Sequence, residues 1–336
     1  MTDATAQSQA DSPAAPAAVE APRPRRPLPL ALLKLARPHQ WSKSVFVLLG
    51  PLYGIQDKPE NMGGMLAAAF VAAGAFALAS SACYVINDLM DAPRDRLHPR
   101  KRHRPIAAGE VSKTVALVYA AVLSVLALAL VGLLAVLPLG VNSAIFALAG
   151  LLIAYVANVT AYSLALKHKV IADVMCLSIG FVLRVLGGCA AADVDPSTWL
   201  LNVTLFLSMF LAFGKRLGER RMMGQHAALT RGVQALYSDE LLRLSASVSA
   251  VATLVTYAGY VQSRGQTHDV LGLSINVLWP TMLPATYALL RAIVQLERGR
   301  YDDPTELFIR DRAMQVAIVA FGVLSVIALA WSHLAG

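Results

Sequence analysis

Four polar residues in the first third of the chain have the types and spacing of ligands for a divalent cation. Asn87, Asp88, Asp91 and Asp95 form an N-D-x-x-D-x-x-x-D pattern. On a helix, residues three or four positions apart lie on one face, so Asn87, Asp91 and Asp95 share a face and Asp88 lies beside it. Carboxylates this close repel one another unless a cation neutralises them. Mg²⁺ prefers such hard oxygen ligands and leaves room for water and phosphate oxygens.

We therefore expect all four residues to bind Mg²⁺, with Asp88, Asp91 and Asp95 taking part in catalysis. The alternative is an ordinary solvated helix end. Pro93 lies inside the pattern and could break the helix, which leaves the position of Asp95 open.

Cationic residues flank the acidic pattern on both sides. Lys101 and Arg104 follow it within a short basic run, and Arg37 and Lys43 lie just before and at the start of the first long apolar segment. Cations beside carboxylates fit a substrate made of a metal ion and phosphate groups. We expect these four residues to bind such a substrate. The alternative, for some of the basic residues, is that they only mark the cytoplasmic side of a membrane segment.

Composition indicates that most of the chain faces lipid. Of the 336 residues, 57% are hydrophobic and only 15% are charged, which is too little charge for a soluble surface of this size. Nine apolar segments are long enough to cross about 30 Å of hydrocarbon. They cover residues 41–56, 64–86, 115–136, 141–163, 170–192, 198–214, 244–262, 276–296 and 313–334. The predicted fold class is an all-α, polytopic membrane protein with nine transmembrane helices, the first kinked at Gly50-Pro51.

The basic residues test this map independently, because cytoplasmic loops retain Lys and Arg. With the N-terminus inside, nearly all of them fall in inner segments, and only Lys58 and Arg264 fall outside. The economical topology has the N-terminus inside and the C-terminus outside. It places the acidic pattern at the cytoplasmic face of an inner or plasma membrane, with the bilayer itself as a partner. The net charge of +8 is then explained without nucleic acid.

Arg184 is an exception, because it lies within the fifth span. It lies roughly 20 Å from the cytoplasmic end of that span. A charge at this depth needs a partner. We favour pairing with a polar group on a neighbouring helix over contact with substrate.

Residues 1–27 are rich in Ala, Pro, Ser and Gln and contain no apolar stretch. This composition is typical of a disordered tail, here on the cytoplasmic side. The catalytic domain is then expected to cover residues 28–336. Cys83, Cys176 and Cys189 lie in apolar runs without metal-ligand spacing, which argues against a disulfide framework or a zinc site.

The sequence resembles the UbiA-type intramembrane prenyltransferases over nearly all of residues 30–334. That family has nine helices in a bundle and the same N-D-x-x-D-x-x-x-D motif after the second. The resemblance also implies a Tyr-x-x-x-Lys-type element after the fourth span, matched here by Tyr162 and by Lys167-His168, with Asp173 following. These four residues are therefore added to the expected substrate-binding set.

One departure from the family pattern narrows the chemistry. Aromatic-acceptor prenyltransferases carry a second Asp-rich motif after the sixth span, whereas this sequence has Lys215, Arg216 and the single acid Glu219. A second metal site is hard to build from one carboxylate, but a phosphate monoester suits these cations. We expect all three residues to bind substrate. The alternative is that the two cations only mark the cytoplasmic boundary.

This cationic variant, with residues 98–109, 180–184 and 304–312, looks like the decaprenyl-phosphate phosphoribosyltransferase branch of the family. The resemblance implies Mg²⁺-dependent transfer of 5-phosphoribose from phosphoribosyl diphosphate to a polyprenyl phosphate, with release of diphosphate. The acceptor phosphate is already largely anionic at neutral pH, so the protein needs no strong base. Asp173 would either contact ribose hydroxyls or neutralise a lysine, two roles that the sequence leaves open.

Two other functions are consistent with the sequence. An enzyme of the same fold could move a prenyl group from a diphosphate onto an aromatic or other acceptor. A transporter or lipid flippase could use carboxylates to handle ions, but its charged groups would lie near the middle of the membrane, in broken helices of two related halves. Nearly all ionisable residues here gather at one face, which disfavours a transporter.

Overall fold

The computed structural model describes residues 26–54, 59–97, 101–223, 236–264, 267–270, 273–298, 307 and 310–334. Its helices are α1 (Leu28–Ala36), η1 (Pro38–Val45), α2 (Phe46–Gly54), η2 (Pro59–Asn61), α3 (Met62–Asp95), η3 (Lys101–His103), α4 (Lys113–Leu133), α5 (Ile145–Leu164), η4 (Leu166–His168), α6 (Ala172–Ala192), α7 (Thr198–Met223), α9 (Asp239–Arg264), η6 (Trp279–Thr281), α10 (Met282–Glu297) and α12 (Arg312–Leu334). Two short strands, β1 (Thr267–Val270) and β2 (Leu273–Asn276), pair antiparallel. The fold is therefore mostly helical, as expected, with one small hairpin in addition.

Some expectations fall outside the described residues. The expected tail, 1–27, lies outside them except for its last two residues. The same holds for residues 98–100 and for most of 304–312, which contributed to the resemblance.

Within the described residues, six helices are long and apolar enough to cross a membrane, namely α3, α4, α5, α6, α7 and α9. They correspond to the second through seventh of the nine expected spans. The first expected span is instead divided between η1 and the nine-residue α2, which contains Pro51. The eighth and ninth correspond to α10, with 16 residues, and α12, of which the stretch Arg312–Ala328 is a shorter apolar helix among the residues searched for spans. Length and composition thus support a multi-pass membrane protein with six clear spans.

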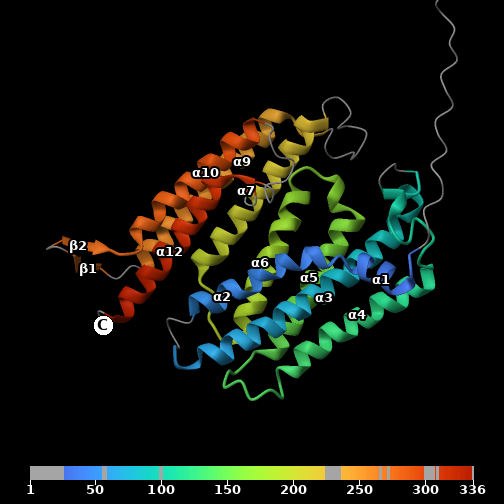
Figure 1. The fold of residues 1–336 in the computed structure, drawn as a ribbon, viewed down its shortest axis with the longest axis horizontal. Coiled ribbons are helices and arrows are strands. Elements are labelled where there is room, and N and C mark those ends of the chain that lie inside the picture. Colours follow the sequence, from blue (N-terminus) through green and yellow to red (C-terminus); the bar gives the residue numbers. More distant parts are fainter. Residues whose placement is uncertain are drawn as a thin grey trace, which may run out of the picture.

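The helices form two groups that lie side by side in Figure 1. One group contains α2 to α6, in blue to green, and the other contains α7, α9, α10 and α12, in yellow to red. Within the groups α3 packs along α4, α5 along α6, and α7 along α9. Helix α6 joins the two groups, because it contacts α2, α3 and α5 on one side and α7 on the other.

Small residues allow the central helices to approach one another closely. Ala68, Ala72, Ala75 and Ala79 are buried along α3 at helical spacing. Helices in membranes associate largely through such close packing. On α6, a Cβ added to Gly188 would collide with the backbone carbonyl oxygen of Val47 on α2. The position of α2 against α6 therefore depends on glycine.

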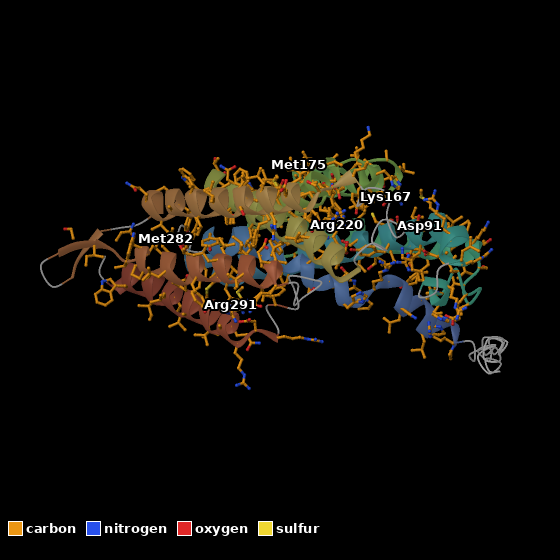
Figure 2. The ribbon with its side chains drawn as sticks, turned by 90° about the horizontal axis from the view of Figure 1, so that it is seen from above. Asp91, Lys167, Met175, Arg220, Met282 and Arg291 are labelled. Carbon is orange, nitrogen blue, oxygen red and sulfur yellow. The ribbon has the colours of Figure 1, made fainter. Side chains whose placement is uncertain are left out.

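Helix α3 is long enough to reach beyond the apolar layer. Its 34 residues extend for about 50 Å, against about 30 Å of hydrocarbon. The helix continues through Pro93 to Asp95, so Pro93 does not break it. Figure 2 shows Asp91 and Lys167 at one end of the molecule and Met282 towards the other. The acidic pattern thus lies at the C-terminal end of α3, at one end of the molecule.

Candidate active site

A cavity of about 590 Å³ lies at the end of the molecule that carries Asp91. Its lining residues come from η1, α3, α5, η4, α6 and α7 and from the segment around η3. Most expected site residues are among them: Arg37, Lys43, Asn87, Asp91, Asp95, Lys101, Arg104, Tyr162, Lys167, His168, Lys215 and Arg216. Only Asp88, Asp173 and Glu219 are absent from the lining. Residues far apart in the sequence are therefore brought to one place.

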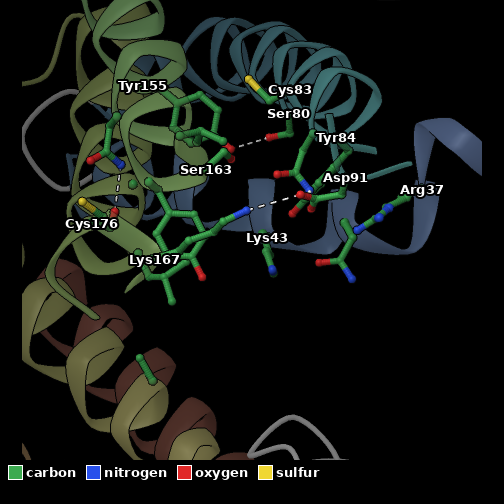
Figure 3. Close-up of a pocket in the computed structure, with 18 of the residues that line it drawn as sticks. Arg37, Lys43, Ser80, Cys83, Tyr84, Asp91, Tyr155, Ser163, Lys167 and Cys176 are labelled. Carbon is green, nitrogen blue, oxygen red and sulfur yellow. Dashed lines mark hydrogen bonds and ion pairs between the residues drawn. The ribbon is translucent and has the colours of Figure 1, made fainter. Parts of the chain in front are cut away.

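Asp91 is the most exposed of the three carboxylates of the acidic pattern. Its side chain is 27% exposed, whereas those of Asp88 and Asp95 are at most 4% exposed. Lys167 Nζ lies 3.4 Å from Asp91 Oδ1, as Figure 3 shows, and Asn87 Nδ2 donates to Asp91 Oδ2 at 3.1 Å. The loop between α5 and α6 thus meets the acidic pattern of α3.

Two arginines hold the other carboxylates. Arg37 Nη2 donates to Asp88 Oδ1 at 2.6 Å. Arg104 Nη1 donates to Asp88 Oδ1 at 3.1 Å and to Asp95 Oδ2 at 2.8 Å. Asp88 does not line the cavity, in keeping with its expected place beside the face of Asn87, Asp91 and Asp95, and its role as a metal ligand stays a prediction. Its position makes it an anchor for Arg37 and Arg104.

The backbone at Arg37 explains how the chain reaches this site. Arg37 has φ 53° and ψ 60°, the left-handed conformation, where it ends α1 and precedes Pro38. This conformation is unfavourable for residues other than glycine and persists only where the surroundings enforce it. The guanidinium lies 4.8 Å from the ring centroid of Tyr84 while pairing with Asp88. The turn therefore places the Arg37 guanidinium against Asp88 and Tyr84 of α3.

Arg216 forms an ion pair with Asp173, a buried acid that does not line the cavity. Its Nε donates to Asp173 Oδ2 at 3.1 Å, and its Nη1 lies 3.3 Å from Glu219. Tyr237 donates to Asp173 Oδ1 at 2.6 Å and accepts the backbone N–H of Ile171 at 2.6 Å. Burial, and then the hydrogen bond to Asp173, raise the pKa of Tyr237, so its hydroxyl remains a donor. Asp173 is fully buried and forms an ion pair with Arg216, an arginine and not a lysine. Its expected contact with substrate stays a prediction.

Arg184 contacts neutral groups on two neighbouring helices. Its Nη2 donates to Ser80 Oγ at 2.8 Å and to the Tyr155 hydroxyl at 2.7 Å. This confirms that polar groups on neighbouring helices are its partners. Arg184 also belongs to the cavity lining, at the end opposite Asp91.

Several lining residues were not anticipated, among them Ser80, Tyr84, Tyr155 and Asn158. The sequence feature that could have identified them is a row of polar residues along one face of an otherwise apolar helix. Ser80 and Tyr84 continue the face of Asn87 and Asp91 at intervals of three or four residues. Tyr155 and Asn158 precede Tyr162 in the same manner on α5. Helical periodicity of polar residues within a span would have identified them.

Positive charge dominates the cavity. Nine Lys or Arg side chains line it, against two Asp. Counting the neighbouring acids Asp88, Asp173 and Glu219, which contact lining arginines, still leaves the cations in excess. Such a cavity is complementary to a ligand with several phosphate groups.

The acidic end offers oxygen donors but no complete cage for a metal ion. Within the part of the chain that the structure describes, no three His, Cys, Asp or Glu residues are grouped closely enough to hold one. Asn87, Asp91 and Asp95, whose side chains carry oxygen atoms, nevertheless line the cavity. Mg²⁺ is often held by one or two carboxylates and completes its shell with water and substrate phosphates. The donors therefore fit a Mg²⁺ ion that binds together with a phosphate substrate.

Several known proteins are similar to this chain. The profile of the UbiA prenyltransferase family matches residues 45–319. A relative from Mycolicibacterium smegmatis, named decaprenyl-phosphate phosphoribosyltransferase, is 35% identical over 327 residues, which is 95% of this chain and 96% of the relative. A relative of the same name from Mycobacterium tuberculosis is 32% identical over 303 residues, 89% of this chain and 94% of the relative. The solved structure of a UbiA homolog from Archaeoglobus fulgidus, bound to GPP and Mg²⁺, has a similar fold, with a TM-score of 0.58 and 18% identity over 90% of this chain and 97% of that chain.

The helical bundle and its polar cavity define a multi-pass membrane transferase. The chain belongs to the UbiA prenyltransferase family, which confirms the resemblance seen in the sequence.

Proposed function

We propose that the protein transfers 5-phosphoribose from phosphoribosyl diphosphate to a polyprenyl phosphate and releases diphosphate. The observation that carries this proposal is the excess of cations in the cavity, nine Lys or Arg against two Asp. The reaction brings together a diphosphate, a 5-phosphate and a lipid phosphate, which is more negative charge than one prenyl diphosphate carries. The names of the relatives from Mycolicibacterium smegmatis and Mycobacterium tuberculosis support the same substrates.

Asp91, with Asn87 and Asp95, would hold Mg²⁺ at the outer end of the cavity. When bound, the ion would supply charge stabilisation for the diphosphate leaving group. Asp88 acts through Arg37 and Arg104, whose guanidinium groups it fixes. This assignment keeps all three carboxylates in the machinery but gives Asp88 a positioning role.

The remaining lining cations bind and orient phosphate groups. Lys167 lines the cavity from η4, which precedes α6, and Arg216 lines it from α7, which follows α6. Lys43, Lys101 and Lys215 add positive charge to the same cavity. No base is required of the chain, because the acceptor phosphate is largely ionised at neutral pH. Accordingly, His168 serves as a hydrogen-bond donor to phosphate.

We further propose nine spans, with the N-terminus inside, the C-terminus outside, and the cavity at the cytoplasmic face of an inner or plasma membrane. Leu97, beside the acidic pattern, is 88% exposed, and Val136, between α4 and α5, is 76% exposed. In a variant without the native cysteines, an impermeant thiol reagent applied to intact cells should label Val136→Cys and spare Leu97→Cys. The reverse result would invert the topology.

The function is tested with purified protein in lipid nanodiscs. Labelled phosphoribosyl diphosphate and polyprenyl phosphate should give a labelled lipid only with Mg²⁺ present, and a chelator should abolish the product. Asp91→Asn should reduce turnover by about 100-fold or more, an amount typical for loss of a charged transition-state contact. Glu297→Gln, which changes an exposed acid paired with Arg243, is the matched control and should retain activity. Product formation only from a prenyl diphosphate and an aromatic acceptor would refute the proposal.

A further inference from the structure

Arg184 is a deeply placed cation at the inner end of the cavity. It lies 12 residues into α6, about 18 Å along the helix. Its side chain is almost entirely buried, yet it belongs to the cavity lining. Nη2 donates to the hydroxyls of Ser80 and Tyr155, and Nη1 donates to the carbonyl oxygen of Gly180 on its own helix at 3.1 Å.

All of these partners are neutral. Among the described residues no carboxylate forms an ion pair with Arg184, and its Nε is buried without a hydrogen-bond partner. The ring of Tyr155, 4.4 Å from Cζ, and that of Phe181, at 5.8 Å, compensate part of the charge. An arginine within a membrane span is otherwise costly without an anion. The geometry therefore leaves a place for an anionic ligand.

The surroundings select the kind of anion. Ser80, Tyr155, Asn158 and Gly180 line this end and supply no carboxylate, so no metal ion would be held here to share the charge of a diphosphate. Asp91 lies 11 residues beyond Ser80 on α3, about 16 Å away along the helix. A guanidinium with two neighbouring hydroxyls suits a single phosphate group, whose oxygens accept several hydrogen bonds.

We propose that Arg184, with the hydroxyls of Ser80 and Tyr155, forms a phosphate-monoester subsite at the inner end of the cavity. This inference rests on the proposed function, in which the two monoesters are the 5-phosphate of the donor and the phosphate of the acceptor lipid. Both present the same chemistry to Arg184, and the experiment distinguishes them.

The test uses the full-length protein in nanodiscs and the variants Arg184→Gln, Arg184→Lys and Tyr155→Phe. KM is measured for each substrate at saturating concentrations of the other, and again with a ribosyl diphosphate donor that lacks the 5-phosphate. Retention of polyprenyl phosphate relative to polyprenol is measured without turnover. Arg243→Gln, an arginine 50% exposed outside the cavity, is the matched control. Thermal unfolding identifies variants that fail to fold. If the Arg184 variants do not fold, the KM values of Tyr155→Phe, which removes one hydroxyl, are compared with those of wild type.

Arg184→Gln should raise KM for one substrate by about tenfold or more, since a hydrogen bond to a charged group is lost. Arg184→Lys and Tyr155→Phe should raise the same KM by smaller factors. If the 5-phosphate is the ligand, wild type and variant become equal with the donor that lacks it. If the lipid phosphate is the ligand, KM for polyprenyl phosphate rises and its retention falls to that of polyprenol.

Unchanged KM for both substrates, or a fall in kcat alone, would overturn the subsite. Wild-type protein that transfers no phosphoribose would instead refute the proposed function. In that case the retention measurement still tests whether Arg184 binds a phosphate monoester.

Discussion

Arg216 and Asp173 form a buried ion pair between α7 and α6, with Arg216 Nε 3.1 Å from Asp173 Oδ2. Arg216 lines the cavity and Asp173 does not. Tyr237 approaches the same carboxylate from the segment that precedes α9. Asp173 therefore fixes the position of the Arg216 guanidinium.

Asp173→Asn should raise KM for a phosphate substrate by about tenfold and leave the Mg²⁺ dependence of the rate unchanged, because Arg216 loses its fixed orientation. Tyr237→Phe should have a smaller effect in the same direction. Steady-state kinetics over a Mg²⁺ titration provide the measurement. Asp239→Asn, which removes the partner of Arg220 at an exposed position, is the control. A shifted Mg²⁺ requirement in Asp173→Asn would show that Asp173 acts on the metal instead.

Two substitutions at Arg37 distinguish the role of its side chain from the conformational free energy of its left-handed backbone. Arg37→Gly and Arg37→Ala both remove the ion pair with Asp88, so both should lose activity. Glycine adopts this conformation freely, so Arg37→Gly should be more stable than Arg37→Ala by about 1 kcal/mol. Thermal unfolding of the two variants in the same detergent measures the difference. Equal stability would mean that the turn relaxes when the guanidinium is removed.

The close approach of α2 and α6 predicts a steric effect at Gly188. Gly188→Ala should destabilise the protein by about 1–3 kcal/mol, because the new methyl group collides with the backbone of Val47. Gly132→Ala is the control, since a Cβ at Gly132 meets no atom within 4 Å. The unfolding temperature of Gly188→Ala should therefore fall below that of wild type, whereas that of Gly132→Ala should not fall comparably. A tolerated Gly188→Ala would show that α2 is free to move.

Asp311 gives a pH dependence of stability. Arg291 Nη2 donates to Asp311 Oδ2 at 2.9 Å, and the backbone N–H of Met314 donates to Oδ1 at 3.0 Å. Hydrogen bonds from Arg291, opposed by burial, hold the pKa of Asp311 below its ordinary value. A lowered pKa means that folding favours the ionised form. The stabilisation is therefore present above the ordinary pKa and is lost as pH falls through the lower, folded-state value.

Unfolding temperatures of wild type and Asp311→Asn measured from pH 7 to pH 3 should test this. The wild-type advantage should be full near neutrality and should shrink below about pH 4. Asp239→Asn, at an exposed ion pair, should show a much smaller difference throughout. A gap between wild type and Asp311→Asn that does not change with pH would mean that the charge of Asp311 contributes nothing.

The sequence predicted the central helices because long apolar segments have few alternatives in a membrane. The sequence predicted short, proline-containing helices less well. The expected span 41–56 forms η1 and α2, with Pro51 inside α2, and the left-handed Arg37 followed by Pro38 separates η1 from α1. Hydropathy alone does not register these backbone constraints.

Within the site, the sequence located residues whose charge is conspicuous beside apolar segments, such as Asp91 and Lys167. It could not find Tyr237, because this residue is 64 positions from Asp173 and carries no local pattern. Helical spacing placed Asp88 beside the face of Asp91, but it could not show that Asp88 pairs with Arg37 and Arg104. Such distinctions arise from tertiary packing.

One continuous helix, α3, carries both ends of the cavity, from Ser80 to Asp95. Each residue of an α-helix advances the direction of its side chain by about 100°. Insertion of a single residue between Ser80 and Asp91 would therefore turn the acidic end away from Arg184 while leaving every side chain in the protein. The spacing along this helix is thus a constraint as strict as the identity of the residues themselves.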